Sequence, residues 1–342
     1  MRFFSLGGSH NKRVELGHQA VDAPTLQIED VSLHINKGSQ RLLAVSEVSL
    51  TIKRGEIFAL VGESGSGKSL IARAIMRLLP PDLLNIEGTV RLCGEDIMGA
   101  SHERMRQLRG GRVSMIFQEP MASLNPLMRV GAQIAEAMAT HSRMTRHDIS
   151  KKVLTLLKDV RFRDAEAVAN AYPHELSGGM RQRIMIAIAL ANDPALLIAD
   201  EPTTALDVTV QREVMDIIVR LQKLHDLSVL FISHDLALVA EYSDRIGILY
   251  GGVLVEEGGT RDVIADPAHP YTSALLDCVP RPRTSGQCQS GIDGAVPPIT
   301  EWWEGCRFAP RCKYALPDCR EGDIAIHSEE VRRWVKCNHP IM

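Results

Sequence analysis

The sequence has no long apolar run and no excess of positive charge. No stretch of 18 uncharged apolar residues occurs among its 342 residues, so no membrane-spanning helix is expected. The first residues include Arg2 and the polar run Asn11, Lys12 and Arg13, and they lack the apolar core of a signal peptide. We therefore expect a cytoplasmic protein whose contact with a membrane depends on partner proteins.

The net charge of −3 argues against a general surface for nucleic acid or anionic lipid. A local run of cations is predicted to be a solvated helix face: Arg104, Arg106, Arg109 and Arg112. The length suggests two domains, or one large domain with insertions, and 45% hydrophobic residues are enough for a sizeable core. Size and composition are therefore compatible with an enzyme.

An apolar strand, a glycine-rich turn and an apolar helix follow one another at residues 57–76. The turn has the pattern G-x-x-x-x-G-K-S and consists of Gly62, Glu63, Ser64, Gly65, Ser66, Gly67, Lys68 and Ser69. Its glycines allow backbone N–H groups to close around phosphates, Lys68 adds a positive charge, and Ser69 offers a hydroxyl to Mg²⁺. The pattern predicts a nucleotide phosphate-binding loop, with the helix beginning at Lys68.

Three further apolar strands end on polar side chains. Residues 195–199 lead to Asp200 and Glu201, residues 113–117 lead to Gln118, and residues 228–233 lead to His234. Asp200 is a candidate Mg²⁺ ligand, and Glu201 could orient or deprotonate a water molecule. Taken singly, the acidic pair could be a helix N-cap and the histidine could be structural. Because parallel strands bring such ends to one edge of a sheet, we expect these side chains to meet there.

Between residues 120 and 182 the pattern becomes helical, with Thr145 and Asp148 forming a predicted cap. This segment ends in a glycine-rich turn with Ser177, Gly178 and Gly179. Ser177 can cap the helix that follows, and the glycines allow backbone N–H groups to approach an anion. An ordinary capped turn explains the same residues.

The remaining pattern predicts three half-buried antiparallel strands, at 26–35, 42–52 and 88–92, with a turn at Gly38. Strands and helices alternate through the rest of the core, which indicates a mainly parallel sheet covered by helices. Residues 1–23 are polar and aperiodic, so we predict a mobile extension there.

Four cysteines gather near the C-terminus: Cys306, Cys312, Cys319 and Cys337. In a reducing compartment such a group suggests a metal before disulfides. Unrelated buried thiols are the alternative. The spacing by itself selects neither zinc nor an iron–sulfur cluster.

Together, these motifs resemble the ATP-binding subunits of ABC transporters. The residue sequences at 61–69, 116–126 and 200–209 look like those of the dipeptide/oligopeptide/nickel importer branch, and so do the C-terminal sequences at 269–272 and 305–312. The resemblance spans residues 25 to 340. It implies an α/β fold with a P-loop NTPase (RecA-like) core, a mainly parallel sheet, an antiparallel β subdomain and a helical subdomain at about 120–182. The ATPase domain would occupy 24–260, and a cysteine-containing extension would occupy 261–342.

The resemblance also implies a composite ATP site between two subunits. Ser177, Gly178 and Gly179 would bind the γ-phosphate in trans, and Asp207 would carry contacts between subunits. Ser69, Gln118 and Asp200 would form the Mg²⁺ site. Glu201 would be the general base, and His234 would contact the γ-phosphate. In these positions the catalytic residues would be Glu201, His234 and Gln118.

The implied partners are a second ATPase subunit, expected to be a related heterodimer partner, two transmembrane permease subunits and an extracytoplasmic solute-binding protein. No nucleic acid is expected. The site would use ATP and Mg²⁺ to import a small solute, most readily di- or oligopeptides, at the cytoplasmic face of the inner membrane. For the four cysteines the resemblance favours a [4Fe–4S] cluster, with zinc as the alternative.

Two competing functions use the same motifs. A soluble ABC ATPase acting on nucleic acid or in translation usually carries a long coiled coil or two cassettes, and neither pattern occurs here. An iron–sulfur sensor without turnover is disfavoured by the presence of Glu201 and His234. One departure from the family concerns the adenine base: Ile35, next to His34, stands where the family usually has a stacking aromatic ring, so either nucleotide affinity or base selectivity is expected to be relaxed.

Overall fold

The computed structural model describes residues 23–38, 40–80, 82, 84–118, 123–203, 206–279, 291–329 and 333–341. The predicted mobile extension at 1–23 lies outside the described residues, apart from Ala23. None of the helices in these ranges is long and apolar enough to cross a membrane.

A large mixed sheet forms the centre of the molecule, with strand order β11-β12-β10-β9-β3-β8-β7-β6. These strands are β3 (Ile57–Val61), β6 (Val113–Ile116), β7 (Leu196–Asp200), β8 (Ser228–Ser233), β9 (Arg245–Tyr250), β10 (Val253–Gly259), β11 (Ile326–Glu329) and β12 (Arg333–Lys336). The five strands from β9 to β6 run parallel, as predicted, whereas β10, β12 and β11 pair antiparallel. Strands β3, β7 and β8 are buried along their whole length, which explains why they are uninterrupted apolar runs.

A smaller antiparallel sheet lies beside this core, in the order β2-β1-β4-β5. Its strands are β1 (Leu26–Lys37), β2 (Gln40–Ile52), β4 (Leu84–Leu92) and β5 (Glu95–Asp96). The predicted strands and the turn at Gly38, where φ is +62°, are confirmed, although β4 begins four residues earlier than expected. Its inner face packs with α1 (Lys68–Ile75) in one apolar cluster.

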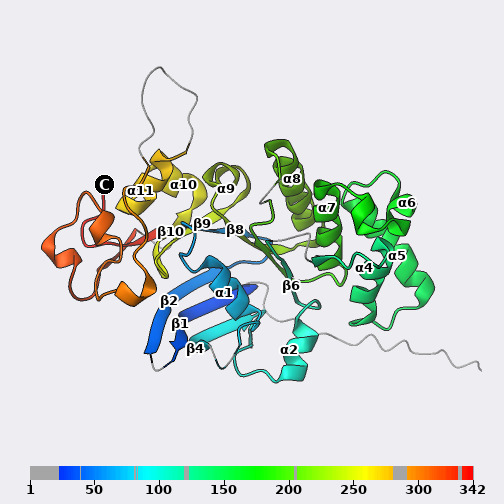
Figure 1. The fold of residues 1–342 in the computed structure, drawn as a ribbon, viewed down its shortest axis with the longest axis horizontal. Coiled ribbons are helices and arrows are strands. Elements are labelled where there is room, and N and C mark those ends of the chain that lie inside the picture. Colours follow the sequence, from blue (N-terminus) through cyan, green and yellow to red (C-terminus); the bar gives the residue numbers. More distant parts are fainter. Residues whose placement is uncertain are drawn as a thin grey trace, which may run out of the picture.

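Helices cover the other face of the large sheet (Figure 1). They are α8 (Val208–His225), α9 (Leu236–Tyr242), α10 (Thr260–Ala265) and α11 (Pro270–Asp277). Figure 1 shows them on the side of the sheet opposite α1 and α2 (His102–Leu108). The five parallel strands of the large sheet therefore lie between two layers, and their carboxyl ends are placed along one edge.

The predicted helical segment forms a group of its own at one end of the molecule (Figure 1). It contains α4 (Val130–Ala139), α5 (Arg146–Asp159), α6 (Ala165–Asn170), the short η1 (Pro173–Glu175) and α7 (Gly178–Ala189). The predicted cap of α5 is confirmed, because the Thr145 hydroxyl accepts the Asp148 N–H at 3.2 Å.

The C-terminal part at the opposite end contains η2 (Ile299–Glu301), η3 (Ala309–Arg311) and η4 (Pro317–Cys319), followed by β11 and β12. The sequence analysis did not identify these two strands. Residues Trp334 and Val335 of β12 pair with Glu257 and Glu256 of β10. The extension is thus joined to the large sheet through backbone hydrogen bonds.

The expectation that the arginine run is a solvated helix face is wrong for Arg109. This residue follows α2, and its Nε and Nη2 donate to the carbonyls of Met76 and Arg77 at 2.8 and 2.7 Å. These carbonyls lie at the C-terminal end of α1, where the helix leaves acceptors without intrahelical partners. Arg109 therefore ties α2 to the helix that follows the phosphate loop.

Candidate functional site

The phosphate loop connects β3 to α1, as predicted, and its backbone is tightly packed. A Cβ on Gly62 would lie 2.1 Å from the carbonyl oxygen of Leu249 in the neighbouring β9. Gly67, which precedes the helix, has φ of +104°, a conformation that favours glycine. These two glycines let the loop curl closely against the sheet and lead directly into the N-terminus of α1, which favours an anion.

Lys68 is buried and folds back across the loop. Its Nζ donates to the carbonyls of Gly62 and Glu63 at 2.7 and 2.9 Å. Burial lowers the pKa of Lys68, while the nearby Glu201 and Asp200 carboxylates oppose this shift. The ammonium is thus held beside two carboxylates at the mouth of the loop.

Asp200, the last residue of β7, meets Ser69 in the first turn of α1. The Ser69 hydroxyl donates to Asp200 Oδ1 at 3.0 Å. Burial raises the pKa of Asp200, and the hydrogen bond from Ser69 counteracts that effect. A serine hydroxyl beside a carboxylate next to a phosphate loop is a donor set that suits Mg²⁺.

Glu201 is the centre of a second polar group at the same edge. Gln118 Nε2 donates to Glu201 Oε2 at 2.9 Å, and His234 Nδ1 lies 3.5 Å from Glu201 Oε1. Glu201 has φ of +48°, an uncommon conformation for a residue other than glycine, and it turns the chain directly after Asp200. The structure therefore brings together the phosphate loop, Gln118, Asp200, Glu201 and His234, which were predicted from four separate strand ends.

The remaining predicted residues form a different group at the start of α7 and α8. The Ser177 hydroxyl accepts the N–H of Met180 at 3.3 Å, and Asp207 accepts the N–H of Val210 at 3.0 Å, so each caps its helix. Ser177, Gly178, Gly179 and Asp207 line one cavity of about 320 Å³. Among the described residues that line this cavity, none belongs to the phosphate loop. Within one chain these residues therefore lie apart from the phosphate loop. We call the two groups the half-sites of the predicted composite ATP site.

The four C-terminal cysteines are also brought together. They line a common cavity with His269, Phe308 and His339. Burial, with smaller contributions from other cysteines of the group, raises the pKa of Cys306 and of Cys337 to about 11. In the absence of a positive ion these thiols are therefore poor thiolates, which is the situation that a bound metal reverses.

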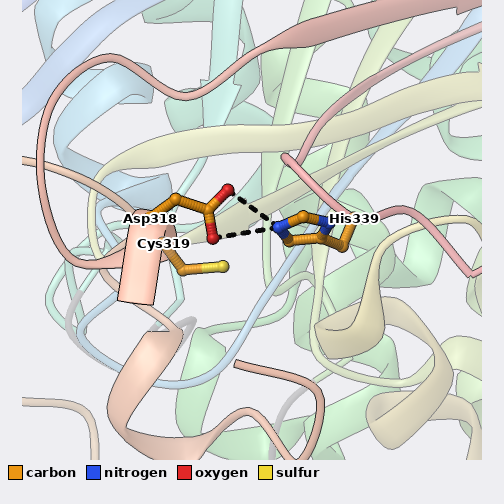
Figure 2. A group of neighbouring side chains, drawn as sticks. All are labelled: Asp318, Cys319 and His339. Carbon is orange, nitrogen blue, oxygen red and sulfur yellow. Dashed lines mark hydrogen bonds and ion pairs between the residues drawn. The ribbon is translucent and has the colours of Figure 1, made fainter. Parts of the chain in front are cut away.

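A tighter group of potential metal ligands occurs at one edge of this cavity (Figure 2). In the described part of the chain, ligand atoms within 4.8 Å of one another are found for Asp318, Cys319 and His339. His339 Nε2 lies 2.8 Å from Asp318 Oδ2, and both point toward the same space as the Cys319 sulfur. The sulfurs of Cys306, Cys312 and Cys337 do not join this group.

Comparison with known proteins identifies the family. Residues 45–204 match the family model described as "ABC transporter", and residues 255–319 match "Oligopeptide/dipeptide transporter, C-terminal region". The probable D,D-dipeptide transport ATP-binding protein of Escherichia coli is 46% identical over 297 residues, which cover 86% of this chain and 90% of the relative. The chain belongs to the ATP-binding subunits of ABC transporters.

Other relatives agree with this membership. The dipeptide transport ATP-binding protein of Haemophilus influenzae is 43% identical over 317 residues, 92% of this chain and 96% of its own. A solved dimeric ATP-binding cassette in a post-hydrolysis state, bound to ADP and phosphate, superposes with a TM-score of 0.61 at 28% identity, covering 69% of this chain and 99% of that one. The predicted P-loop NTPase fold is confirmed, and the nucleic-acid alternative gains no support.

The ABC subunit has contacts around its phosphate loop that the sequence analysis missed. The N–H of Gly252, in the turn between β9 and β10, donates to the Ser66 carbonyl at 2.8 Å. Arg311 and Tyr271, from the C-terminal extension, both contact Glu63. The C-terminal motifs that contain Tyr271 and Arg311 were identified in the sequence. No sequence pattern, however, connects them with Glu63, which is more than 200 residues away.

Ile35 lies in β1, opposite Leu42 of β2 and Leu84 of β4, and is half-buried. The neighbouring His34 lies 3.7 Å from Glu87. Since neither partner of Ile35 is aromatic, the structure provides no stacking ring at these two paired positions. Weaker adenine stacking thus stays a prediction.

Proposed function

We propose that this chain hydrolyses ATP to drive peptide import by an ABC transporter, with Glu201 as the general base. The observation that supports this most directly is the meeting of Lys68, the Ser69–Asp200 pair and the Gln118–Glu201–His234 group at one sheet edge. Each of these side chains has the chemistry that phosphoryl transfer to water requires. The relatives are named for dipeptide and oligopeptide transport, which indicates the substrate class.

In this proposal the residues divide the work of the reaction ATP + H₂O → ADP + phosphate. Lys68 and the loop N–H groups bind the phosphates; Ser69, Asp200 and Gln118 would hold Mg²⁺, which would supply charge neutralisation there. Glu201 accepts a proton from the attacking water, Gln118 orients that water, and His234 bonds to the γ-phosphate. The contacts of Glu201 with both Gln118 and His234 keep the base directed into the site.

The separation of the two half-sites supports a head-to-tail pair of ATPase subunits. Ser177, Gly178 and Gly179 lie at the start of α7, whereas the phosphate loop precedes α1, in a different part of the molecule (Figure 1). A second ATPase subunit, in our proposal a related heterodimer partner, supplies its own glycine-rich turn to close the site. Asp207, which lines the same cavity as Ser177, carries contacts between the subunits.

The complete transporter would add two transmembrane permease subunits and an extracytoplasmic solute-binding protein. The ATPase would lie on the cytoplasmic face of the inner membrane as a peripheral subunit. Pull-down of the permease subunits by the tagged chain, followed by uptake of labelled dipeptides, tests this assignment. Retention of full peptide uptake in cells that lack the chain would contradict it.

The variant Glu201→Gln tests the hydrolytic mechanism. It keeps the shape of the side chain and one acceptor oxygen for Gln118 but removes the proton acceptor, so ATP binding should remain while turnover falls by about 100-fold or more. In the presence of the second ATPase subunit, ATP should then trap a dimer that gel filtration detects. Glu103→Gln, the same change on α2, serves as the control and should hydrolyse ATP as the unchanged protein does. Turnover by Glu201→Gln at the unchanged rate would refute the role of Glu201.

For the cysteine cavity we propose a [4Fe–4S] cluster held by Cys306, Cys312, Cys319 and Cys337. Four thiols around one cavity match the ligands of such a cluster. A tetrahedral zinc with Zn–S bonds of about 2.3 Å would hold sulfurs about 3.8 Å apart. Three of the four sulfurs lie outside the one group whose ligand atoms approach within 4.8 Å in the described part of the chain, so the thiols are spread more widely than zinc requires.

Zinc is the second candidate because Asp318, Cys319 and His339 already lie close together. Anaerobic purification with iron, sulfide and zinc analysis separates the two. The cluster predicts four irons, a brown colour and loss of iron in Cys312→Ser. A colourless, iron-free protein with one equivalent of zinc, retained in Cys312→Ser but lost in His339→Ala, would support zinc and overturn the cluster.

A further inference from the structure

Glu63 of the phosphate loop is held by the C-terminal extension through two of its three polar groups. Its backbone N–H donates to the Tyr271 hydroxyl at 2.9 Å. Its carboxylate accepts two hydrogen bonds from Arg311, Nη1 to Oε2 at 2.8 Å and Nη2 to Oε1 at 3.2 Å. The third group, its carbonyl, accepts from Lys68 Nζ at 2.9 Å. The Glu63 carbonyl also accepts the Ser66 N–H at 3.1 Å, and Lys68 Nζ also donates to the Gly62 carbonyl at 2.7 Å. The extension therefore positions one of the two carbonyls that hold the Lys68 ammonium.

Arg311 is fixed so that it can act as a rigid clamp. Its side chain is only 6% exposed. Nε donates to the Asp293 carbonyl at 2.9 Å, and Nη2 donates to the carbonyls of Ile292 and Gly294 at 3.3 and 3.2 Å. Because the guanidinium is planar and its donors are already directed by these carbonyls, the two bonds to Glu63 allow little rotation of that carboxylate.

Tyr271 is equally constrained. It lies in α11 and is fully buried. Its ring packs against Tyr250 and Phe308, with ring centroids 4.6 and 5.3 Å apart. Phe308 also lines the cysteine cavity. The Tyr271 hydroxyl is thus presented to the loop from an aromatic cluster that connects the large sheet with the extension.

The charge of Glu63 gives Arg311 a specific task. A carboxylate in a loop that binds a triphosphate repels the ligand unless a nearby cation neutralises it. The Glu63 side chain is 25% exposed, so water screens this charge only in part. The bidentate pair with Arg311 cancels the charge and also restricts rotation of the carboxylate.

We propose that Arg311 and Tyr271 are positioning residues of the ATP site: they hold Glu63, neutralise its charge and set one of the two carbonyls that orient Lys68. This inference rests on the proposed role of the phosphate loop in ATP binding. It makes the C-terminal extension part of the nucleotide site of its own subunit. The extension then controls the affinity for ATP more than the rate of the chemical step.

Four variants of the full chain test the inference: Arg311→Gln, Arg311→Gln combined with Glu63→Gln, Tyr271→Phe, and Arg104→Gln as the matched control. Arg104 forms another bidentate pair, with Glu95, away from the loop. The measurements are the Kd of a fluorescent ATP analogue and the separate values of KM and kcat for ATP hydrolysis.

Arg311→Gln should raise Kd and KM by about tenfold, because it exposes the Glu63 charge, while kcat changes little. The double variant should recover most of this loss, since removing the carboxylate removes the repulsion. Tyr271→Phe should raise Kd by a smaller factor, and Arg104→Gln should leave it unchanged. A merely structural Arg311 would lower stability in both the single and the double variant without this recovery.

The inference is overturned if Arg311→Gln binds the analogue as tightly as the unchanged protein, or if the double variant binds no better than the single one. Absence of nucleotide binding by the unchanged protein is a different result. It would contradict the proposed function of the phosphate loop itself.

Discussion

At Gly62 a single methyl group would reach the backbone of the adjacent strand. The added Cβ would lie 2.1 Å from the Leu249 carbonyl oxygen, and β9 cannot move because it lies inside the large sheet. Gly94, in the turn between β4 and β5, makes a useful contrast. Its φ is +81°, and a Cβ added there would meet no atom of the described residues within 4 Å. The two glycines are thus required for different reasons.

We predict that Gly62→Ala lowers stability by about 1–3 kcal/mol through overpacking and abolishes the rise in Tm that ATP produces. Gly94→Ala should cost about 1 kcal/mol through its backbone conformation alone and keep the full ATP-dependent rise. Thermal unfolding with and without ATP and Mg²⁺ provides the measurement. An equal ATP-dependent rise in both variants would contradict the close packing of the loop.

His269 is a buried histidine at the start of α11, where its Nδ1 accepts the N–H of Tyr271 at 3.0 Å. Burial lowers its pKa to about 3. The folded state therefore binds a proton less readily than the unfolded state, whose histidine has a pKa near 6.5. Stability from this residue is complete above about pH 6.5 and is lost as the pH falls from there toward 3.

His269→Asn keeps an acceptor for the Tyr271 N–H but cannot titrate in this range. Between pH 7.5 and 5.5 the unchanged protein should lose about 1.4 kcal/mol more stability than the variant. Urea unfolding at both pH values, compared between the two proteins, removes any acid effect they share. Identical pH dependence in both would show that His269 is not kept neutral by the fold.

Among the secondary-structure elements, the junction of α7 and α8 combines packing with function. A Cβ on Gly179 would lie 2.7 Å from Cγ1 of Val210, in the first turn of α8. The sequence predicted Ser177 as a cap and glycines for close approach to an anion. The structure adds a second reason for Gly179, which is the contact between two helices that the sequence does not show to be neighbours.

Combining Gly179→Ala with Val210→Ala should distinguish these reasons. Alanine at position 210 is smaller than valine and relieves the contact with the new methyl group at position 179. Alanine at position 179 also favours the helix over glycine by about 1 kcal/mol, so stability should return to near the original value. ATP turnover should stay low, because the methyl group still blocks the phosphate approach proposed in trans. Recovery of both stability and turnover would reduce Gly179 to a packing residue.

For the molecule as a whole, the proposed composite site makes turnover depend on association of two ATPase subunits. The phosphate loop with Glu201 would form one half-site, and the cavity at Ser177 and Asp207 would form the other. We predict that ATP turnover per chain, measured with an equal amount of the second ATPase subunit, rises with subunit concentration and then levels off when the dimer is fully formed. Steady-state rates across a dilution series, with dimer content measured by light scattering in parallel, test this. Constant turnover per chain down to concentrations at which only monomer remains would contradict the composite site.

Short-range patterns in the sequence were enough to predict the local chemistry of this protein. The strand, loop and helix around Lys68, the polar ends of β6, β7 and β8, and the cap of α5 all follow from patterns of hydrophobicity, glycine and capping residues. Such patterns are set within a few residues, because backbone conformation and burial of one face are local requirements. This is why the site could be assembled from four strand ends before their positions were known.

Which distant segments meet became visible only in the folded chain. Three contacts join segments that no repeating sequence pattern relates to each other. They are the antiparallel pairing of β12 with β10, the hydrogen bonds of Arg109 to the end of α1, and the contacts of Arg311 and Tyr271 with Glu63. These contacts depend on how whole layers pack against each other. A single sequence does not show which distant residues this packing brings together. The sequence thus specified a phosphate loop, whereas the fold showed that this loop is held in place by the far end of the same subunit.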